Sequence, residues 1–129
     1  MRDTCADNLT ILQTSECAII DGTFSYAPRH FKQMYTIHGF KNNFYVPTVF
    51  CFLQKKSEVE YSKMWTEIQN LSVKLTGQAL NISVVYADFE IAAHSCIYKI
   101  FPECKIICCL FHLSQCWFRH SRQIFIKRI

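Results

Sequence analysis

The chain has 129 residues, which is enough for one domain or part of one. Half of its residues are apolar and 15% are aromatic, so we expect a packed core, and this composition excludes global disorder. The net charge of +4 is unevenly placed, because residues 104–129 carry five cations and no acid.

Targeting and redox features exclude two further classes of protein. The first residues hold two early acids and no apolar run, so they do not predict a signal peptide, and the apolar run 106–111 is too short to span a bilayer. Most of the eight cysteines fall inside apolar patterns, where a free thiol behaves as a small hydrophobic residue. We therefore expect a protein of a reducing compartment rather than a disulfide-bonded secreted one.

The first half of the chain predicts strands. Residues 1–16 are polar and weakly patterned, and we expect a poorly structured lead-in there. Three apolar segments, 17–24, 33–38 and 45–53, then predict three strands. The first passes through Asp21 and is turned by Gly22, and residues 39–43 supply turn residues between the other two. These short connections favour an antiparallel meander.

The second half alternates helix and strand patterns. Apolar residues at helical spacing from Tyr61 to Leu75 predict a helix, with Ser57 as its N-cap and Gly77 at its end. A buried strand begins at Ile82 and stops at Asp88. The remaining predicted elements are a helix over 89–100, a strand over 105–109 and a helix over 114–126.

The predicted order is β-β-β-α-β-α-β-α, which indicates an α/β domain with a mixed five-stranded sheet and helices packed against it. This order resembles that of the ribonuclease-H-like fold. In that architecture the ends of the first and fourth strands lie side by side near the centre of the sheet. Asp21 and Asp88 would then meet.

Two carboxylates that lie close together repel each other unless a cation neutralises them. Mg²⁺ takes oxygen ligands and leaves positions open for phosphate oxygens, and two such ions about 3.5–4 Å apart can activate a water or a 3′-hydroxyl. Asp21 and Asp88 as metal ligands would therefore favour strand cleavage or strand transfer. The structural alternative is that both aspartates only cap the turn or helix after each strand.

Motifs that share their order and spacing with one known family run through most of the chain. They are Asp-Gly-Thr-Phe at 21–24, Tyr-Thr-Ile-His at 35–38, Ala-Asp-Phe-Glu at 87–90, Phe-Pro at 101–102 and Cys-Leu-Phe-His at 109–112. From about residue 17 to about residue 119 the sequence resembles the Mutator-like element (MULE) transposase domain.

The resemblance implies a cut-and-paste DNA transposase with a ribonuclease-H-like core, an Asp-Asp-Glu triad, and Mg²⁺ or Mn²⁺ as cofactor. It matches Asp21 to the first acid and Asp88 to the second. It matches Cys109 and His112 to a Cys-x-x-His element that supports the active site. It also implies DNA as the partner, a homo-oligomer as a possible assembly, and the nucleus as the location. No membrane partner is expected.

The third acid of the family has no counterpart in this sequence. That Glu lies beyond the Cys-x-x-His element, whereas no acid follows Glu103, and Glu90 lies further upstream. We therefore expect residues 17–129 to be a partial catalytic core, truncated before the third acid. Because losing a group that fixes a catalytic metal costs orders of magnitude in rate, we expect little strand transfer by the chain alone.

Cysteine and histidine crowd residues 104–120, and a structural zinc site is a further hypothesis for this segment. Its ligands would be Cys108 or Cys109 together with His112, Cys116 or His120. A buried thiol beside a histidine at a helix start is the simpler interpretation. We interpret Trp65 and Trp117 as core residues on helix faces.

The basic C-terminal segment fits a polyanion such as DNA, and a solvated helix face is the alternative. Its candidate DNA contacts are Arg119, Arg122, Lys127 and Arg128. Three functions remain open. They are a transposase-derived domain, now incomplete; a DNA- or protein-interaction module that keeps the fold without catalysis, with or without zinc; and a metal-dependent nuclease that obtains its last carboxylate elsewhere.

Overall fold

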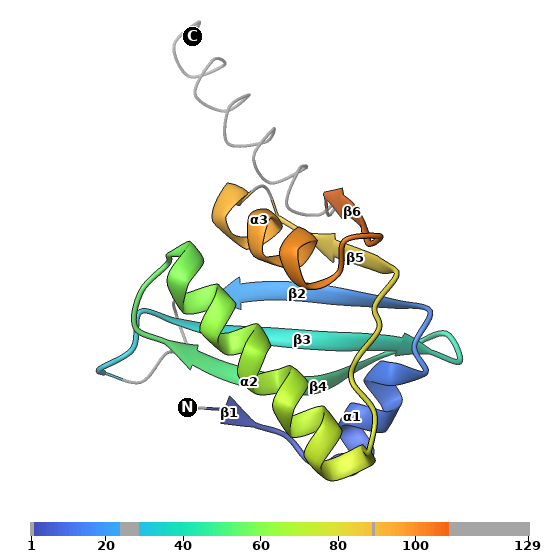
Figure 1. Cartoon of the computed structure of the whole chain (residues 1–129). Helices are drawn as coiled ribbons and strands as arrows, with labels where there is room; N and C mark the ends of the chain where they lie inside the picture. The colour runs from blue at the N-terminus through green and yellow to red at the C-terminus, as the bar shows by residue number, and fades with distance from the viewer. Residues whose placement is uncertain (1, 24–28, 89, 109–129) are drawn as a thin grey trace, which may run out of the picture.

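The computed structural model describes residues 2–23, 29–88 and 90–108, and within them it shows a mixed sheet with helices on one side (Figure 1). The strands are β1 (Arg2–Asp3), β2 (Cys17–Thr23), β3 (Gln33–Lys41), β4 (Phe44–Leu53), β5 (Val84–Ala87) and β6 (Lys105–Cys108). The helices are α1 (Ala6–Gln13), α2 (Glu58–Thr76) and α3 (Ile91–Ile100).

The order of strands across the sheet is β1-β4-β3-β2-β5-β6. Strands β2, β3 and β4 pair antiparallel, whereas β2 pairs with β5 and β5 with β6 in parallel. Without the short edge strand β1, the five remaining strands have the predicted mixed arrangement, which is consistent with a ribonuclease-H-like fold. The prediction of the fold class is confirmed, while the predicted helix over 114–126 lies outside the described residues.

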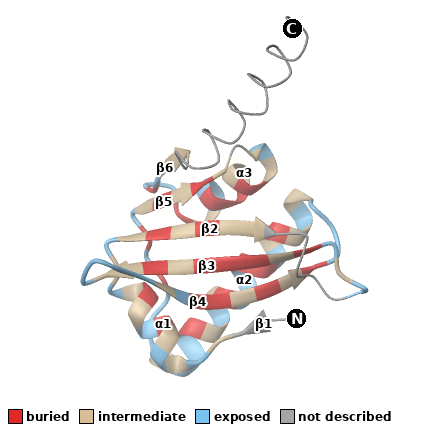
Figure 2. Cartoon of the chain, turned by 180° about the vertical axis from the view of Figure 1, so that it is seen from behind, coloured by how far each residue is buried: buried red, intermediate tan, exposed pale blue. Residues whose placement is uncertain are grey.

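The three helices that the structure describes pack on the same face of the sheet. Seen from behind, strands β2, β3 and β4 lie in front of the helices (Figure 2). Along β2, Ala18 and Ile20 are buried, whereas Cys17, Ile19 and Asp21 are only half-buried. Side chains alternate between the two faces of a strand, so Ala18 and Ile20 face the helices and Asp21 faces the other side.

Helix α2 has the ends that the sequence predicts. The Ser57 hydroxyl accepts a hydrogen bond from the Glu60 amide at 3.3 Å, which satisfies one of the free amides of the first turn. Gly77 follows the last turn with a φ of 79°, a left-handed conformation that glycine adopts without strain. Both caps are confirmed.

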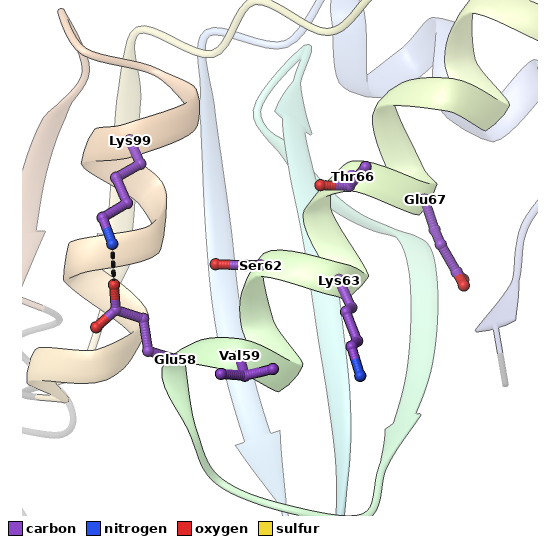
Figure 3. A pocket seen from close by; sticks show the side chains of 7 residues that line it. All are labelled: Glu58, Val59, Ser62, Lys63, Thr66, Glu67 and Lys99. Carbon is purple, nitrogen blue, oxygen red and sulfur yellow. Dashed lines mark hydrogen bonds and ion pairs between the residues drawn. The ribbon is translucent and has the colours of Figure 1, made fainter.

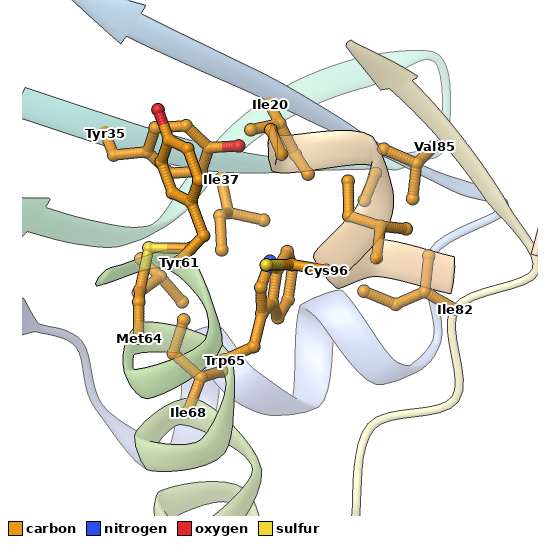
Figure 4. Packing of buried hydrophobic residues seen from close by; sticks show 14 of the residues in the cluster. Ile20, Tyr35, Ile37, Tyr61, Met64, Trp65, Ile68, Ile82, Val85 and Cys96 are labelled. Carbon is orange, nitrogen blue, oxygen red and sulfur yellow. The ribbon is translucent and has the colours of Figure 1, made fainter. Parts of the chain in front are cut away.

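The core lies between the sheet and helices α2 and α3 (Figure 4). Trp65 on α2 is completely buried and meets the ring of Phe101 edge to face, with 5.5 Å between the ring centroids. The Cys96 thiol on α3 donates to the Glu58 carbonyl oxygen at 3.1 Å. Our interpretation of Trp65 as a core residue is therefore confirmed.

We expected a poorly structured lead-in over residues 1–16, but residues 2–16 are structured. Helix α1 buries Leu9 and Leu12 in the core, and β1 pairs with β4 at the sheet edge. The Gln13 side-chain amide donates to the hydroxyls of Ser72 and Thr76 on α2, at 2.9 and 2.7 Å. Two leucines in a polar run were a weak signal, but their burial joins this segment to the domain.

The hairpin between β3 and β4 is also longer than the sequence suggests. Gly39 belongs to β3 rather than to the turn, which consists of Asn42 and Asn43 with φ of 52° and 64°. A Cβ at residue 39 would lie 2.4 Å from the Ser15 hydroxyl oxygen, so this glycine serves a close approach of chains. Asparagine tolerates positive φ, which explains how the two-residue turn forms.

Within the described ranges, no helix combines the length and the apolar character that crossing a membrane requires.

Candidate metal centre

The parallel pairing of β2 with β5 brings Asp21 and Asp88 to the same level of the sheet. Ala18 is registered with Val85, and Ile19 with Tyr86. Two further steps along both chains lead to Asp21 and Asp88. Adjacent strands lie about 4.8 Å apart, so residues at the same level of this pair are close neighbours in the fold.

Within β2, alternation turns Asp21 away from the helices, because Ile20 before it is buried toward them. Asp88 directly follows β5, and its charge acts on the buried phenols of Tyr35 and Tyr61. Both aspartates are half-buried. Asp21 is also paired with Thr36 of β3. The carboxyl ends of strands are where open α/β sheets collect functional groups.

The donor set of this position fits a hard divalent cation. Two carboxylates supply oxygen ligands, and Mg²⁺ is often held by one or two carboxylates together with waters and substrate phosphates. Among the described residues, no three His, Cys, Asp or Glu side chains are grouped closely enough to hold a metal ion. Asp21 and Asp88 would thus hold an ion as a pair, leaving several of its positions for other ligands.

The main chain at Asp88 is fixed by the start of α3. The carbonyl oxygen of Asp88 accepts from the Glu90 amide at 3.0 Å and from Nε2 of His94 at 2.6 Å. Because a carbonyl oxygen can only accept, His94 carries a proton on Nε2 here. Two donors on one oxygen restrict rotation of the peptide group that follows Asp88.

Glu90 connects this position to α2 and β3. The Tyr61 hydroxyl donates to Oε1 of Glu90 at 2.7 Å, and the side-chain amide of Gln33 donates to the Tyr61 oxygen at 3.0 Å. Nζ of Lys56 lies 3.8 Å from Oε2 of Glu90. Although Glu90 is the N-cap residue of α3, its side chain makes no capping hydrogen bond with that helix. The carboxylate is instead held by Tyr61 and Lys56.

Two buried phenols lie beside these carboxylates. Burial raises the pKa of Tyr35 well above its usual value, and the charges of Tyr61, Asp88 and Glu90 raise it further. Burial likewise raises the pKa of Tyr61, as does its hydrogen bond to Glu90, while the hydrogen bond from Gln33 opposes this shift. Both phenols are therefore protonated at neutral pH and act as hydrogen-bonding groups rather than as bases.

Other predicted site residues lie outside the described ranges. They are Cys109 and His112 of the Cys-x-x-His element, and the candidate DNA contacts Arg119, Arg122, Lys127 and Arg128. The zinc hypothesis also depends on residues beyond Cys108. Within the described residues the cysteines are free thiols, and Cys51, Cys96 and Cys104 are buried.

A hollow of about 600 Å³ lies elsewhere, along the outer side of α2 and beside α3 (Figure 3). Its walls carry charges of both signs, from Glu58, Glu67, Lys63 and Lys99. Glu58 and Lys99 pair with each other across the two helices. The hollow includes neither aspartate, so we do not assign the metal centre to it.

The roles of Tyr61, Gln33 and His94 did not emerge from the sequence. Tyr61 fitted the apolar face of a helix, and that pattern says nothing about its hydroxyl. Two local signals were present. Gln33 is a polar residue at the start of a predicted strand, and Glu90 stands two residues after Asp88.

Comparison with known families adds an independent observation. The family model described as the MULE transposase domain matches residues 17–116, which is most of the chain. No curated protein matches the chain. The matched range includes all of β2 to β6, and therefore both Asp21 and Asp88.

Proposed function

This chain belongs to the MULE transposase domain family, and from that premise we propose that Asp21 and Asp88 hold the catalytic metal of a DNA strand-transfer enzyme. The family consists of metal-dependent transposases of the Asp-Asp-Glu type. The observation that supports the proposal is the register of β2 and β5, which puts Asp21 and Asp88 at one level of two neighbouring strands. Two aspartates that only capped turns would not have to lie at the same level of neighbouring strands.

The roles of the chain's own groups follow from their chemistry. Asp21, two residues before the end of β2, and Asp88, directly after β5, supply the charge and the oxygen ligands of two carboxylates. A bound Mg²⁺ or Mn²⁺ would neutralise this charge, activate a water or 3′-hydroxyl, and stabilise the leaving oxygen of a phosphodiester. Since neither aspartate needs to give up or accept a proton, both act as ligands rather than as acid or base.

Exposed cations at the same end of the sheet support a DNA substrate. Strand β4 ends and β3 begins there, and the Lys32 amide donates to the Leu53 carbonyl oxygen at 2.8 Å, which holds the two connections together. Arg29, Lys32 and Lys55 are exposed on these connections. Lysine and arginine contacts to phosphate position a duplex without reading its sequence. We include them as DNA contacts beside the basic C-terminal segment.

The family's triad contains a third carboxylate, and these 129 residues offer two of its members. We infer that this chain binds the metal weakly and transfers strands slowly by itself, because ligands that fix a catalytic ion affect its rate by orders of magnitude. A third carboxylate from further residues or from a second protein would raise both metal affinity and rate.

Titration calorimetry with Mn²⁺ tests the metal centre. We expect wild type to bind Mn²⁺, and Asp21→Asn and Asp88→Asn each to weaken the affinity at least tenfold, because each removes a charged ligand. Asp7→Asn, on the exposed surface of α1, is the matched control and should leave the affinity unchanged. Urea unfolding curves establish that the variants remain folded.

Equal heats for wild type and both site variants would overturn the metal centre. That result would favour the second candidate, a module that binds DNA or protein and keeps the fold without catalysis. The exposed cations named above would still serve such a module. Binding of duplex DNA in the presence of a chelator would then measure its activity.

A further inference from the structure

We propose that Tyr61 and Glu90 are positioning residues, which set the orientation of Asp88 toward Asp21 and thereby the metal affinity of the pair. The inference rests on the proposed function, because it concerns the same metal centre. It assigns Glu90 a role other than that of a third ligand. It also assigns α2, a helix that carries neither aspartate, a part in forming the site.

The Glu90 carboxylate is already occupied by two partners. One oxygen accepts from the Tyr61 hydroxyl at 2.7 Å, and the other lies 3.8 Å from the Lys56 ammonium group. Hydrogen bonds to a charged acceptor are stronger than those between neutral groups. Turning this carboxylate toward an ion near Asp88 would leave the buried Tyr61 hydroxyl without its acceptor, which is unfavourable.

Tyr61 is a rigid anchor for that carboxylate. Its side chain is completely buried, and its ring packs on Tyr35 of β3 with 5.4 Å between the ring centroids (Figure 4). A phenol has one proton, and here that proton goes to Glu90, so the same oxygen accepts from Gln33. One hydroxyl therefore joins α2, β3 and the start of α3.

Glu90 transmits this restraint to Asp88 through the main chain. Its amide donates to the Asp88 carbonyl oxygen at 3.0 Å, beside the His94 bond to the same atom. If Glu90 moved, that carbonyl would lose one donor and the Asp88 residue could rotate relative to β5. Two carboxylates hold one ion only when both point at it, so such rotation lowers the affinity.

A second link between α2 and α3 provides a matched control. Lys99 pairs with Glu58 on the outer side of the two helices (Figure 3). This pair also joins α2 to α3, but neither residue contacts Asp88, Glu90 or Tyr61 in the hydrogen bonds and ion pairs that the structure describes. Lys99→Ala removes this outer link and keeps the bond between Tyr61 and Glu90. It therefore tests whether loosening α2 from α3 is by itself enough to weaken metal binding.

Mn²⁺ calorimetry on Tyr61→Phe, Glu90→Gln, Glu90→Ala and Lys99→Ala separates positioning from ligation. We expect Tyr61→Phe and Glu90→Ala to weaken Mn²⁺ binding about tenfold, the lower end of the effect of outer-shell partners. Glu90→Gln should stay within about threefold of wild type, because its amide oxygen still accepts from Tyr61. Lys99→Ala should bind as wild type does.

Two outcomes overturn the proposal. If Tyr61→Phe binds Mn²⁺ like wild type, the anchor does not set the affinity. If Glu90→Gln is as weak as Glu90→Ala while Tyr61→Phe is normal, Glu90 is itself a ligand. Should Glu90→Ala fail to fold, Tyr61→Phe alone tests the proposal, since it removes only the hydroxyl oxygen and is the smaller change to the core.

A measurement without metal keeps this inference separate from the proposed function. Hydrogen exchange of the Glu90 amide reports the bond to the Asp88 carbonyl oxygen directly. We expect faster exchange in Tyr61→Phe than in wild type and no change in Lys99→Ala. If wild type and Asp88→Asn give equal Mn²⁺ heats, the proposed function fails, and unchanged exchange in Tyr61→Phe would still overturn the anchor.

Discussion

Tyr35 and Tyr61 are unusual among the buried residues because each holds a titratable group beside carboxylates. Burial raises the pKa of both, and the charges of Asp88 and Glu90 add to the shift. The folded protein therefore holds both phenolic protons more tightly than the unfolded chain does. Linkage then requires the stability of the fold to depend on alkaline pH.

The sign of this dependence follows from the raised pKa values. Below about pH 10, the usual pKa of a phenol, both tyrosines are protonated in the folded and unfolded states, and their full contribution to stability is present. As the pH rises above that value, the unfolded chain loses protons first and the free energy of unfolding falls. Urea unfolding between pH 8 and 11 should show this fall.

Tyr61→Phe is expected to make that fall shallower, because one of the two phenols no longer titrates. Tyr45→Phe is the control, since it removes the same hydroxyl from an exposed side chain. A Tyr61→Phe curve parallel to wild type across this range would show that the Tyr61 phenol titrates with an ordinary pKa.

At this same scale, the sequence predicted Asp21 and Asp88 but not the groups that hold Asp88. A strand that stops on a carboxylate can be recognised in the sequence, since the apolar run ends at one residue. The bond between Tyr61 and Glu90 cannot be recognised in this way, because it joins a helix to a turn far along the chain. Pairings of that kind depend on how α2 packs across the sheet.

Among the elements, α1 shows how a short helix can be missed. Only Leu9 and Leu12 of its eight residues are buried, and Cys5 at its start makes no capping hydrogen bond through its side chain. Its stability comes instead from tertiary packing, which is usual for helices shorter than about 12–15 residues. Leu9 is completely buried in the hydrophobic core.

Leu9→Ala is expected to lower the free energy of unfolding by about 2–5 kcal/mol, the cost of truncating a buried leucine. Leu75→Ala makes the same chemical change on α2, at a side chain that is 42% exposed. Its effect should be well below that of Leu9→Ala. Urea unfolding of both variants measures the difference, and equal effects would show that α1 is not part of the cooperative unit.

The longer elements were predictable because their signals agree. In α2 the apolar spacing, the Ser57 cap and Gly77 all indicate the same helix, and the structure contains it. The end of β3 was harder, because Gly39 reads as a turn residue. Gly39 pairs with Ala18 and Val46 in the sheet, and Ser15, which follows α1, approaches it closely, a contact that periodicity does not reveal.

At the scale of the whole molecule, the proposed DNA substrate would approach the end of the sheet where β2 and β5 end. Lys32 and Lys55 are exposed on connections near the ends of β2 and β5, whereas Lys63 and Lys74 are exposed on α2. A duplex that presents a phosphate to Asp21 and Asp88 would contact the first pair and not the second. Replacing Lys63 and Lys74 by alanine removes the same amount of charge as replacing Lys32 and Lys55, so that double variant is a matched control.

Fluorescence anisotropy with a labelled duplex at several salt concentrations tests this arrangement. The double variant Lys32→Ala/Lys55→Ala should bind more weakly, and its plot of log affinity against log salt should be shallower by about 2, since each phosphate contact contributes about 0.9 to the slope. Lys63→Ala/Lys74→Ala should keep the wild-type slope. Identical slopes for all three proteins would place the duplex elsewhere.

The central position of β2 has a consequence for synthesis. Asp21 leaves the ribosome well before Asp88, and between them the chain must complete a three-stranded hairpin unit and a nineteen-residue helix. The two aspartates become neighbours only when β5 joins β2, a contact between distant segments that forms slowly. At the proposed metal centre, an ion could bind a nascent chain only once this strand is in place, so ion uptake during translation would mark the closing of the sheet.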